Sequence, residues 1–537
     1  MKNYLLIAFL ILCIVSKADA QNQNVAKQSA DTIKDFREFK VLDSKYIDNV
    51  ALWAPFNADL KDFSEATYTA LKPLILEQDI PTLQNNIALG KLTYEKLVLF
   101  YLYRIRKFDR ENKLSLNAVI VLNPTVVEEA RQKDKQAKPL LGFSVFGMPI
   151  LLKDNINAAG MPTTAGAAAL QENMAEDAFI VKQLKNNGAL ILGKANLSEW
   201  AYFFCGDCPS GYSAVGGQTL NPYGRRIFDT GGSSSGSGVA VAANFCVAAV
   251  GSETSGSILS PSSQNSVVGL KPTIGLLSRT GIIPISSTLD TPGPMTKNVI
   301  DNAIILEAMI GFDKEDSASV KFESEPESNT NNTSLKGKRF GAFKGLMEDS
   351  LYVEALSKLK NEGAEIIEIE QQQIELPGFI RLLNLDMKND LPVYLEKYAN
   401  EAISVKSVED VMEFNKKDSL KSAPYGQALF QGIADDKGSL EDLERIKDTL
   451  STNGKLFFEG PMNKHNLDGI LSVNNFHAGY AAVAKYPAMT VPMGYQKDGK
   501  PRGLTFIAKP FQEKYLLHWA YVYEKASNKR TAPKNYN

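Results

Sequence analysis

From about residue 140 to the C-terminus, short apolar runs alternate with amphipathic stretches. The apolar runs are flanked by Gly, Pro and polar residues and predict buried strands, at residues 148–152, 189–192, 246–250, 340–343, 470–473, 488–491 and 504–508. Between two of them, the spacing of Ala178, Val181 and Leu184 predicts a helix. Strands that alternate with helices in this way are typical of an α/β fold with a buried parallel or mixed sheet.

Two segments depart from this alternation and are predicted to be helical. Residues 21–135 are mainly helical in pattern, and so is the block at about 377–460, in which Ser439 and Asp442 form a helix-capping pattern. The polar stretch 321–334 predicts a loop. With 537 residues, of which 44% are hydrophobic, the chain can bury a large core. We predict one domain over residues 21–537, with an N-terminal helical region and a helical insertion.

Residues 1–20 have the features of a cleaved signal peptide. Lys2 supplies a positive charge, residues 4–15 form an apolar run, and Ala18 and Ala20 are small residues suited to a cleavage site. The apolar run is too short to remain in a bilayer as a spanning helix. We therefore expect an exported protein, periplasmic or secreted, that is cleaved near Ala20 and has no stable membrane span.

The charge balance argues against a polyanionic partner. The chain has 59 Lys and Arg residues against 61 Asp and Glu residues, a formal net charge of -2. Binding to nucleic acid depends on neutralising phosphates with clustered basic residues. We therefore expect no nucleic-acid partner.

The cysteines allow two interpretations. Cys205 and Cys208 have the CxxC spacing, but a structural zinc site needs four ligands and no second CxxC or HxxxH pattern exists. In an oxidising compartment, a local disulfide or a pairing with Cys246 is expected instead. Both pairings remain open at this point, and no metal is implied.

The run from Gly231 to Pro272 concentrates residues suited to chemistry. Two Gly/Ser-rich turns flank residues 239–250, which are apolar and must be buried, so a flexible linker is excluded. Tight turns of small residues bring backbone N–H groups close to a ligand. Gly231 and Gly236 have the spacing of a phosphate-binding loop, but the lysine that such a loop requires is missing.

Residues 232–236 also match G-x-S-x-G, the nucleophile motif of α/β-hydrolases. That motif must follow a strand, whereas residues 221–230 are polar and turn-like. It also needs a histidine, and the chain has only His465, His477 and His518. A hydrolase of that type is therefore disfavoured.

Several motifs in order resemble those of the amidase signature family. They are residues 147–155 (GMPILLKDN), 193–196 (GKAN), 231–234 (GGSS), 256–258 (GSI), 269–273 (GLKPT), 290–295 (DTPGPM) and 486–488 (YPA). The resemblance covers roughly residues 85–310 and 467–533. It implies an α/β fold with a large mixed, twisted β-sheet core, covered by helices on both faces and interrupted by the helical insertion.

The resemblance also assigns roles to individual residues. Lys153 matches the catalytic lysine, Ser233 matches the serine held through a cis peptide bond, and Ser257 matches the nucleophile. Ser234 matches the neighbouring serine that supports the lysine. The expected oxyanion hole consists of backbone N–H groups of Thr254, Ser255, Gly256 and Ser257.

The implied chemistry is consistent with the residues present. A serine hydroxyl is a weak nucleophile and needs a base. A lysine can serve as the base if burial favours its neutral form, and Lys153 ends an apolar run. Lys153 would take the proton of Ser257 by way of Ser233, an acyl-enzyme would form on Ser257, and water would release the acid. No metal or organic cofactor is implied.

Three positions depart from the family's pattern. Ser255 and Lys485 stand where glycine is common, and Leu259 stands where arginine is common. Glu253, with residues 216–218 (GGQ) upstream, is most like the peptide-amidase branch. These differences bear on substrate preference rather than on the three catalytic positions.

We therefore predict an exported serine amidase that hydrolyses a small-molecule or peptide carboxamide to an acid and ammonia or an amine. A catalytically inactive family member and an exported solute-binding protein remain as alternatives. A third candidate, the amidotransferase A subunit, is disfavoured by the signal peptide, because tRNA-dependent amidation is cytosolic. The substrate pocket is expected where residues 377–460 meet Tyr202, Phe203 and Phe204.

Overall fold

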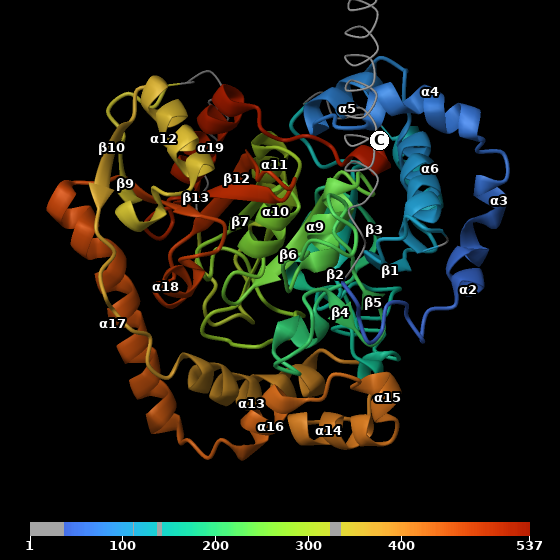
Figure 1. Cartoon of the computed structure of the whole chain (residues 1–537). Coiled ribbons are helices and arrows are strands. Elements are labelled where there is room, and N and C mark those ends of the chain that lie inside the picture. Colours follow the sequence, from blue (N-terminus) through green and yellow to red (C-terminus); the bar gives the residue numbers. More distant parts are fainter. Residues whose placement is uncertain (1–36, 111, 137–141, 323–333) are drawn as a thin grey trace, which may run out of the picture. The chain divides into compact units, whose positions relative to one another are not determined.

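A mixed sheet forms the centre of the computed structural model, which describes residues 37–110, 112–136, 142–322 and 334–537 (Figure 1). Residues Phe39–Asn537 form one compact unit. Within the described residues the sheet has eleven strands, in the order β1 (Val119–Leu122), β3 (Leu190–Ala195), β2 (Pro149–Lys153), β6 (Ala248–Glu253), β8 (Thr291–Thr296), β7 (Val268–Lys271), β12 (Ala488–Tyr495), β13 (Pro501–Ile507), β11 (Gly469–Val473), β9 (Arg339–Phe343) and β10 (Glu365–Ile369). A separate small sheet pairs β4 (Tyr212–Ser213) with β5 (Gly217–Gln218).

The pairing of the strands is part parallel and part antiparallel. Strand β2 pairs parallel with both β3 and β6, and β9 pairs parallel with β10 and β11. The other pairs of the large sheet are antiparallel. Strands β2, β3 and β6 are buried along their whole length, which explains why their sequences are apolar runs rather than alternating patterns. This confirms the predicted α/β class with a mixed sheet.

All seven predicted strands form, and four strands of the large sheet were not predicted. Strand β8 is the clearest case, because Pro292 and Pro294 suggest a turn rather than a strand. It is nevertheless held between β6 and β7 and is buried throughout. Strands β1, β7 and β10 are only four or five residues long and carry weak local signals.

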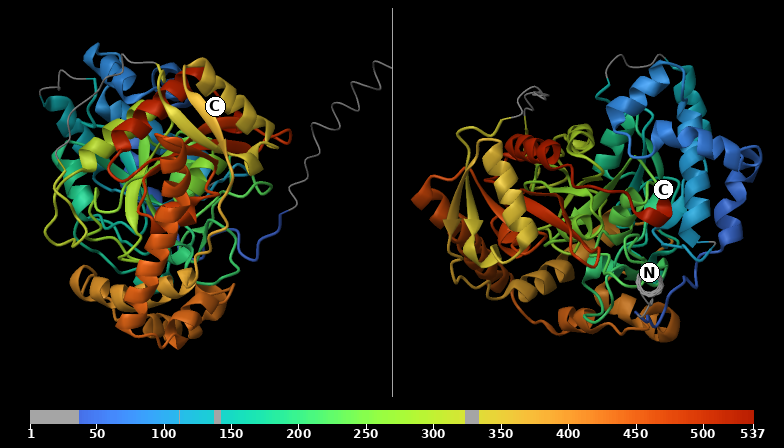
Figure 2. Two further views of the ribbon diagram at one scale, coloured as in Figure 1. Left: turned by 90° about the vertical axis from the view of Figure 1, so that its left-hand side faces the viewer. Right: turned by 45° about the horizontal axis from the view of Figure 1, so that its top comes forward.

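Helices cover both faces of the sheet. The side chains of strand β12 show this, because neighbouring residues contact helices on opposite faces. Thr490 faces α10 (Leu259–Gln264), because its hydroxyl is hydrogen-bonded to Ser263. Its neighbours Met489 and Val491 point to the opposite face and belong to the main core together with Trp519 of α19 (Glu513–Ser527). Figures 1 and 2 show helices on either side of the sheet.

The remaining helices fall into three groups along the chain. The N-terminal group is α2 (Asn49–Trp53), α3 (Asn57–Leu60), α4 (Glu65–Ile75), α5 (Ile80–Ala88), α6 (Tyr94–Ile105) and α7 (Val126–Lys135). The helices among the strands are α8 (Phe179–Asn186), α9 (Ser235–Ala242), α11 (Val299–Met309), α12 (Ser350–Asn361) and α18 (Ala478–Val483). The insertion consists of α13 (Phe379–Lys397), α14 (Val408–Lys416), α15 (Ser419–Ser422), α16 (Ala428–Asp435) and α17 (Leu440–His465).

The insertion has its own hydrophobic core, and α17 connects it to the sheet. The predicted capping box at Ser439 is present: its hydroxyl accepts from Asp442 N, and its own N–H donates to the Asp442 carboxylate, both at 3.1 Å. Trp200 and Phe204 join the core of the insertion. Figures 1 and 2 show the insertion helices at one end of the molecule, with α17 leading from them towards α18.

None of the described helices is long and apolar enough to cross a membrane. The predicted signal peptide, residues 1–20, lies outside the described residues.

Candidate active site

Lys153 is the last residue of β2 and is completely buried. Its ammonium group donates to Ser233 Oγ at 2.7 Å, to Ser252 Oγ at 2.9 Å and to the Ser252 carbonyl at 3.0 Å. Burial lowers the pKa of Lys153 to about 7, although the nearby carboxylates of Asp290 and Glu253 oppose the shift. A substantial fraction of the side chain is therefore neutral at neutral pH and able to accept a proton.

The contact between Lys153 and Ser252 follows from the parallel pairing of β2 and β6. The carboxyl ends of neighbouring parallel strands meet at the same edge of a sheet. Ser252 lies near that end of β6, and its hydroxyl also accepts from Asn155 Nδ2 at 3.0 Å. Sequence analysis did not single out Ser252, and its position at the end of an apolar run is the signal that could have done so.

Ser233 and Ser234 lie in the turn before α9 and are fully buried. The peptide bond between Gly232 and Ser233 is cis. Ser234 Oγ donates to the Ser252 carbonyl at 3.1 Å, the same carbonyl that binds Lys153, and Ser234 N donates to the Ser257 carbonyl at 3.1 Å. Ser234 thus links Ser252, the partner of Lys153, to the turn that carries the predicted nucleophile Ser257, residues 254–258, called the nucleophile turn below.

Ser257 lies in the turn between β6 and α10 and is 8% exposed. The buried Glu253 carboxylate holds this turn by accepting three backbone N–H groups, from Gly256 at 2.7 Å, Ile258 at 2.7 Å and Leu259 at 2.9 Å. Among the described residues, the Ser257 hydroxyl makes no hydrogen bond, to Ser233 or to any other group. Its oxygen is therefore free to approach a substrate.

The backbone N–H groups predicted to form the oxyanion hole differ in whether they already donate a hydrogen bond. The N–H of Gly256 is already bonded to Glu253. The N–H groups of Thr254, Ser255 and Ser257 have no acceptor within the described part of the chain. The Thr254 side chain is anchored by its hydroxyl, which donates to the Asp290 carboxylate. In this geometry, the N–H groups of Thr254, Ser255 and Ser257 are free to bind a developing oxyanion, and that of Gly256 is not.

A small cavity adjoins these groups. Its lining includes Asn155, Ser252, Thr254 and Asp290, the immediate neighbours of Lys153 and of the nucleophile turn. Leu259, where arginine is common in the family, is not part of this lining and belongs to a buried apolar cluster that includes Phe457 and Phe458 of α17.

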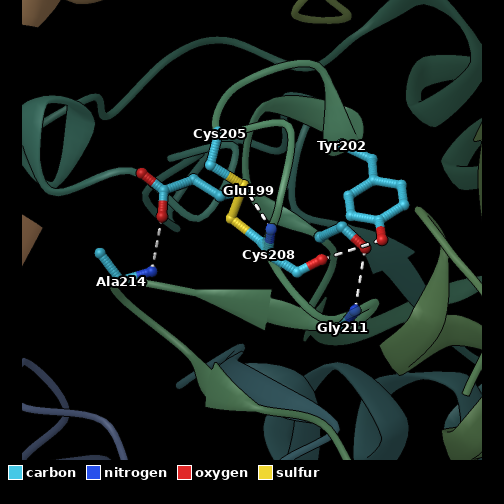
Figure 3. Close-up of a disulfide and its surroundings, with 7 residues drawn as sticks. Glu199, Tyr202, Cys205, Cys208, Gly211 and Ala214 are labelled. Atoms are coloured by element: carbon cyan, nitrogen blue, oxygen red, sulfur yellow. Dashed lines mark hydrogen bonds between the residues drawn. A yellow bond between two sulfur atoms is a disulfide. The ribbon is translucent and has the colours of Figure 1, made fainter. Parts of the chain in front are cut away.

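Cys205 and Cys208 form a disulfide, and Cys246 is free and buried. Figure 3 shows the disulfide beside Tyr202, whose hydroxyl donates to the Cys208 carbonyl at 2.9 Å. Leu429 N of α16 donates to the Phe204 carbonyl at 3.0 Å, so this loop also binds the insertion. The described residues contain no group of three or more His, Cys, Asp and Glu placed to hold a metal ion.

The buried Lys153, its partner Ser233 and the turn that carries Ser257 all lie in the motifs that resemble the amidase signature family. A family model described as Amidase matches residues 96–426. The chain belongs to the amidase family. This confirms the resemblance drawn from the motifs, and with it the enzyme class, a hydrolase of carbon–nitrogen amide bonds.

Individual relatives match most of the chain. A probable amidase of Arabidopsis thaliana is 36% identical over 467 residues, 83% of this chain and 89% of the relative. The crystal structure of an amidase family protein from Bacillus anthracis has a TM-score of 0.85 and 36% identity, and the match covers 92% of this chain and 99% of that one. The peptide amidase from Stenotrophomonas maltophilia has a TM-score of 0.79 at 36% identity, with coverage of 85% and 98%.

Proposed function

We propose that this protein is an exported serine amidase that hydrolyses a carboxamide through an acyl-enzyme on Ser257, with Lys153 as base and Ser233 as proton relay. The observation that carries the proposal is the hydrogen bond of 2.7 Å between the fully buried Lys153 amine and Ser233 Oγ. A lysine whose pKa is about 7 is partly neutral at neutral pH and can accept a proton from a hydroxyl group.

The proposed reaction has two halves. Neutral Lys153 takes the Ser233 hydroxyl proton while Ser233 takes that of Ser257, and Ser257 Oγ bonds to the amide carbonyl carbon. The negative charge on the carbonyl oxygen is stabilised by N–H groups among those of Thr254, Ser255 and Ser257. The proton then returns through Ser233 to the amide nitrogen, the C–N bond breaks, and ammonia or an amine leaves.

In the second half, water adds to the ester and loses its proton along the same route, and the acid is released from Ser257. The relay requires the Ser257 and Ser233 hydroxyls to come within hydrogen-bond distance when substrate binds. Catalytic hydrogen bonds are often long without substrate and tighten in the complex. The likeness to a peptide amidase supports a peptide C-terminal amide as the substrate class.

Covalent labelling tests the nucleophile. The mature protein is incubated with a fluorophosphonate beside the Ser257→Ala variant, and the adduct is located by peptide mapping. We expect one adduct, on Ser257, that is absent from the variant, together with ammonia release from a peptide amide by the wild-type protein only. An adduct on Ser234 would favour the α/β-hydrolase motif instead. A folded protein without any adduct would favour the inactive or solute-binding alternative.

Export is supported by the signal-peptide features of residues 1–20 and by the Cys205–Cys208 disulfide, because disulfides persist mainly in oxidising compartments. N-terminal sequencing of the protein from the cells that produce it naturally tests this. We expect a mature chain that starts just after Ala20, recovered outside the cytosol. A protein that keeps Met1 would contradict export.

A further inference from the structure

A cavity of about 230 Å³ lies between the insertion and the rest of the fold. Its walls come from four segments: α13, α17, the end of α18 with the second residue beyond it, and the loop before β8. They contribute Leu382, Lys447, Val483, Lys485, Thr288 and Leu289. None of these residues takes part in the chemistry proposed above.

Lys485 is the unusual member of this lining. Its φ is 60°, in the left-handed region that favours glycine and is strained for residues with a side chain. Its ammonium group has no hydrogen bond or ion pair with any residue that the structure describes. Burial lowers the pKa of Lys485, and so do the cations Arg279, Lys455 and Lys447 around it. The Lys485 side chain is exposed to solvent, so a strained position holds a cation that is solvated by water and has no counter-charge from the protein.

The other charges of the cavity do not neutralise Lys485. Glu444 is paired with Lys447 at 2.9 Å, and Lys447 also lies 3.9 Å from the buried Asp386. Asp448 is exposed on α17. The charged groups that shift the pKa of Lys485 are all cationic. The site around Lys485 therefore favours an anionic occupant.

Two walls of the cavity lead back to the nucleophile. Helix α18 starts beside the nucleophile turn, where a methyl group on Gly256 would lie 3.6 Å from Ala478 Cβ, and ends at Val483 in the cavity wall. The five residue-to-residue steps from Ala478 to Val483 cover about 8 Å along the helix. On the other wall, Leu289 directly precedes Asp290, which binds the Thr254 hydroxyl. An extended peptide spans about 3.4 Å per residue, so the cavity is two to three residues from the scissile amide.

We propose that Lys485, with Lys447 beside it, binds a carboxylate of the substrate two or three residues from the amide that is hydrolysed. The preferred substrates are then acidic peptide amides. This inference rests on the proposed amidase function and makes its substrate class specific.

Matched peptide amides test the inference. Acetyl-Glu-Ala-Ala-amide carries the carboxylate at the required distance, and acetyl-Gln-Ala-Ala-amide is its neutral counterpart. For the wild-type protein, we expect a kcat/KM for the Glu peptide about three- to tenfold above that for the Gln peptide, the range for a partly exposed charge pair. In Lys485→Asn the preference disappears through a higher KM for the Glu peptide, with kcat unchanged. Asparagine is chosen because it tolerates a positive φ. Lys485→Arg should retain the preference.

Lys455→Gln is the matched control, because it removes a nearby positive charge that does not line the cavity. It should leave the preference in place. Equal hydrolysis of the two peptides by the wild-type protein, or an equal loss in Lys455→Gln and Lys485→Asn, would overturn the inference while leaving the amidase function intact.

A binding measurement on a variant without the nucleophile tests the Lys485 site independently of the proposed amidase activity. The Ser257→Ala protein and its Lys485→Asn double variant are titrated with both peptides carrying a fluorescent label. Tighter binding of the Glu peptide that depends on Lys485 supports the site even if the wild-type protein hydrolyses neither peptide, a result that would reject the proposed function. Binding that is independent of Lys485 rejects the site.

Discussion

Replacing Lys153 by methionine is expected to lower kcat for amide hydrolysis by about 10²- to 10⁴-fold, the usual contribution of a general base. Methionine has a similar length and no basic nitrogen, so it removes the proton acceptor without opening a large cavity. Lys153 is fully buried, and an uncharged side chain suits that environment. The variant should therefore fold, and its loss should be in kcat rather than in KM. Initial rates of ammonia release measure both.

The pH dependence of kcat/KM tests whether the loss of activity comes from loss of the Lys153 base. The base is active when it is neutral, and burial places the pKa of Lys153 at about 7. The wild-type kcat/KM should therefore rise as the pH increases through about 7 and level off above it. Lys153→Met should lack this limb.

Lys271→Met is the control, because Lys271 is also fully buried, donates to the Tyr486 carbonyl instead of a serine, and has a pKa lowered by burial to about 8. It should keep the limb near pH 7. Retention of that limb in Lys153→Met would show that Lys153 is not the base, and its loss in both variants would show that the limb is not specific to Lys153.

The same pKa has a consequence for stability. The folded-state pKa of Lys153 lies below its ordinary value of 10.5, so the unfolded chain binds more protons between about pH 7 and 10.5. The contribution of Lys153 to the free energy of unfolding is therefore least favourable at pH 7 and improves as the pH rises. Relative to the wild-type protein, Lys153→Met should be more stable at pH 7 than at pH 10.

Replacing Lys194 by methionine is expected to lower the free energy of unfolding by about 3–5 kcal/mol, because it leaves a buried carboxylate without its cation. Lys194 and Asp154 are both fully buried and lie 3.2 Å apart on neighbouring segments at the edge of the sheet that carries Lys153. Lys194 also donates to Thr163 Oγ1 at 2.8 Å. Denaturant unfolding at pH 7 measures the change.

A double variant that removes both charges distinguishes the cost of an unpaired buried charge from the cost of altered packing. The double variant Asp154→Asn with Lys194→Met should be less destabilised than Lys194→Met alone, because no unpaired charge remains buried. The exposed pair Lys344–Glu370 provides the comparison, and Lys344→Met should leave stability nearly unchanged. If Lys194→Met is as stable as the double variant, or more stable, Lys194 and Asp154 do not form a buried ion pair.

The sequence by itself determined the parts of this protein that depend on local pattern. Apolar runs such as 148–152 predict strands wherever they must be buried, and Ser439 predicts a helix start because capping involves residues only three apart. The position of Lys153 at the end of such a run already indicated a buried amine. Motif resemblance supplied Ser233 and Ser257, and with them the family.

The tertiary structure alone decided the features that depend on which segments become neighbours. Pro292 and Pro294 sit in a central strand because β6 and β7 flank it. Ser252 contacts Lys153 because β2 and β6 pair in parallel, and Glu253 holds the nucleophile turn because the chain folds back over its carboxylate. The cavity beside Lys485 exists because α13 and α17 pack near α18. Hydrogen bonds and cavities between residues far apart in sequence leave no periodic pattern, so only the packed structure reveals them.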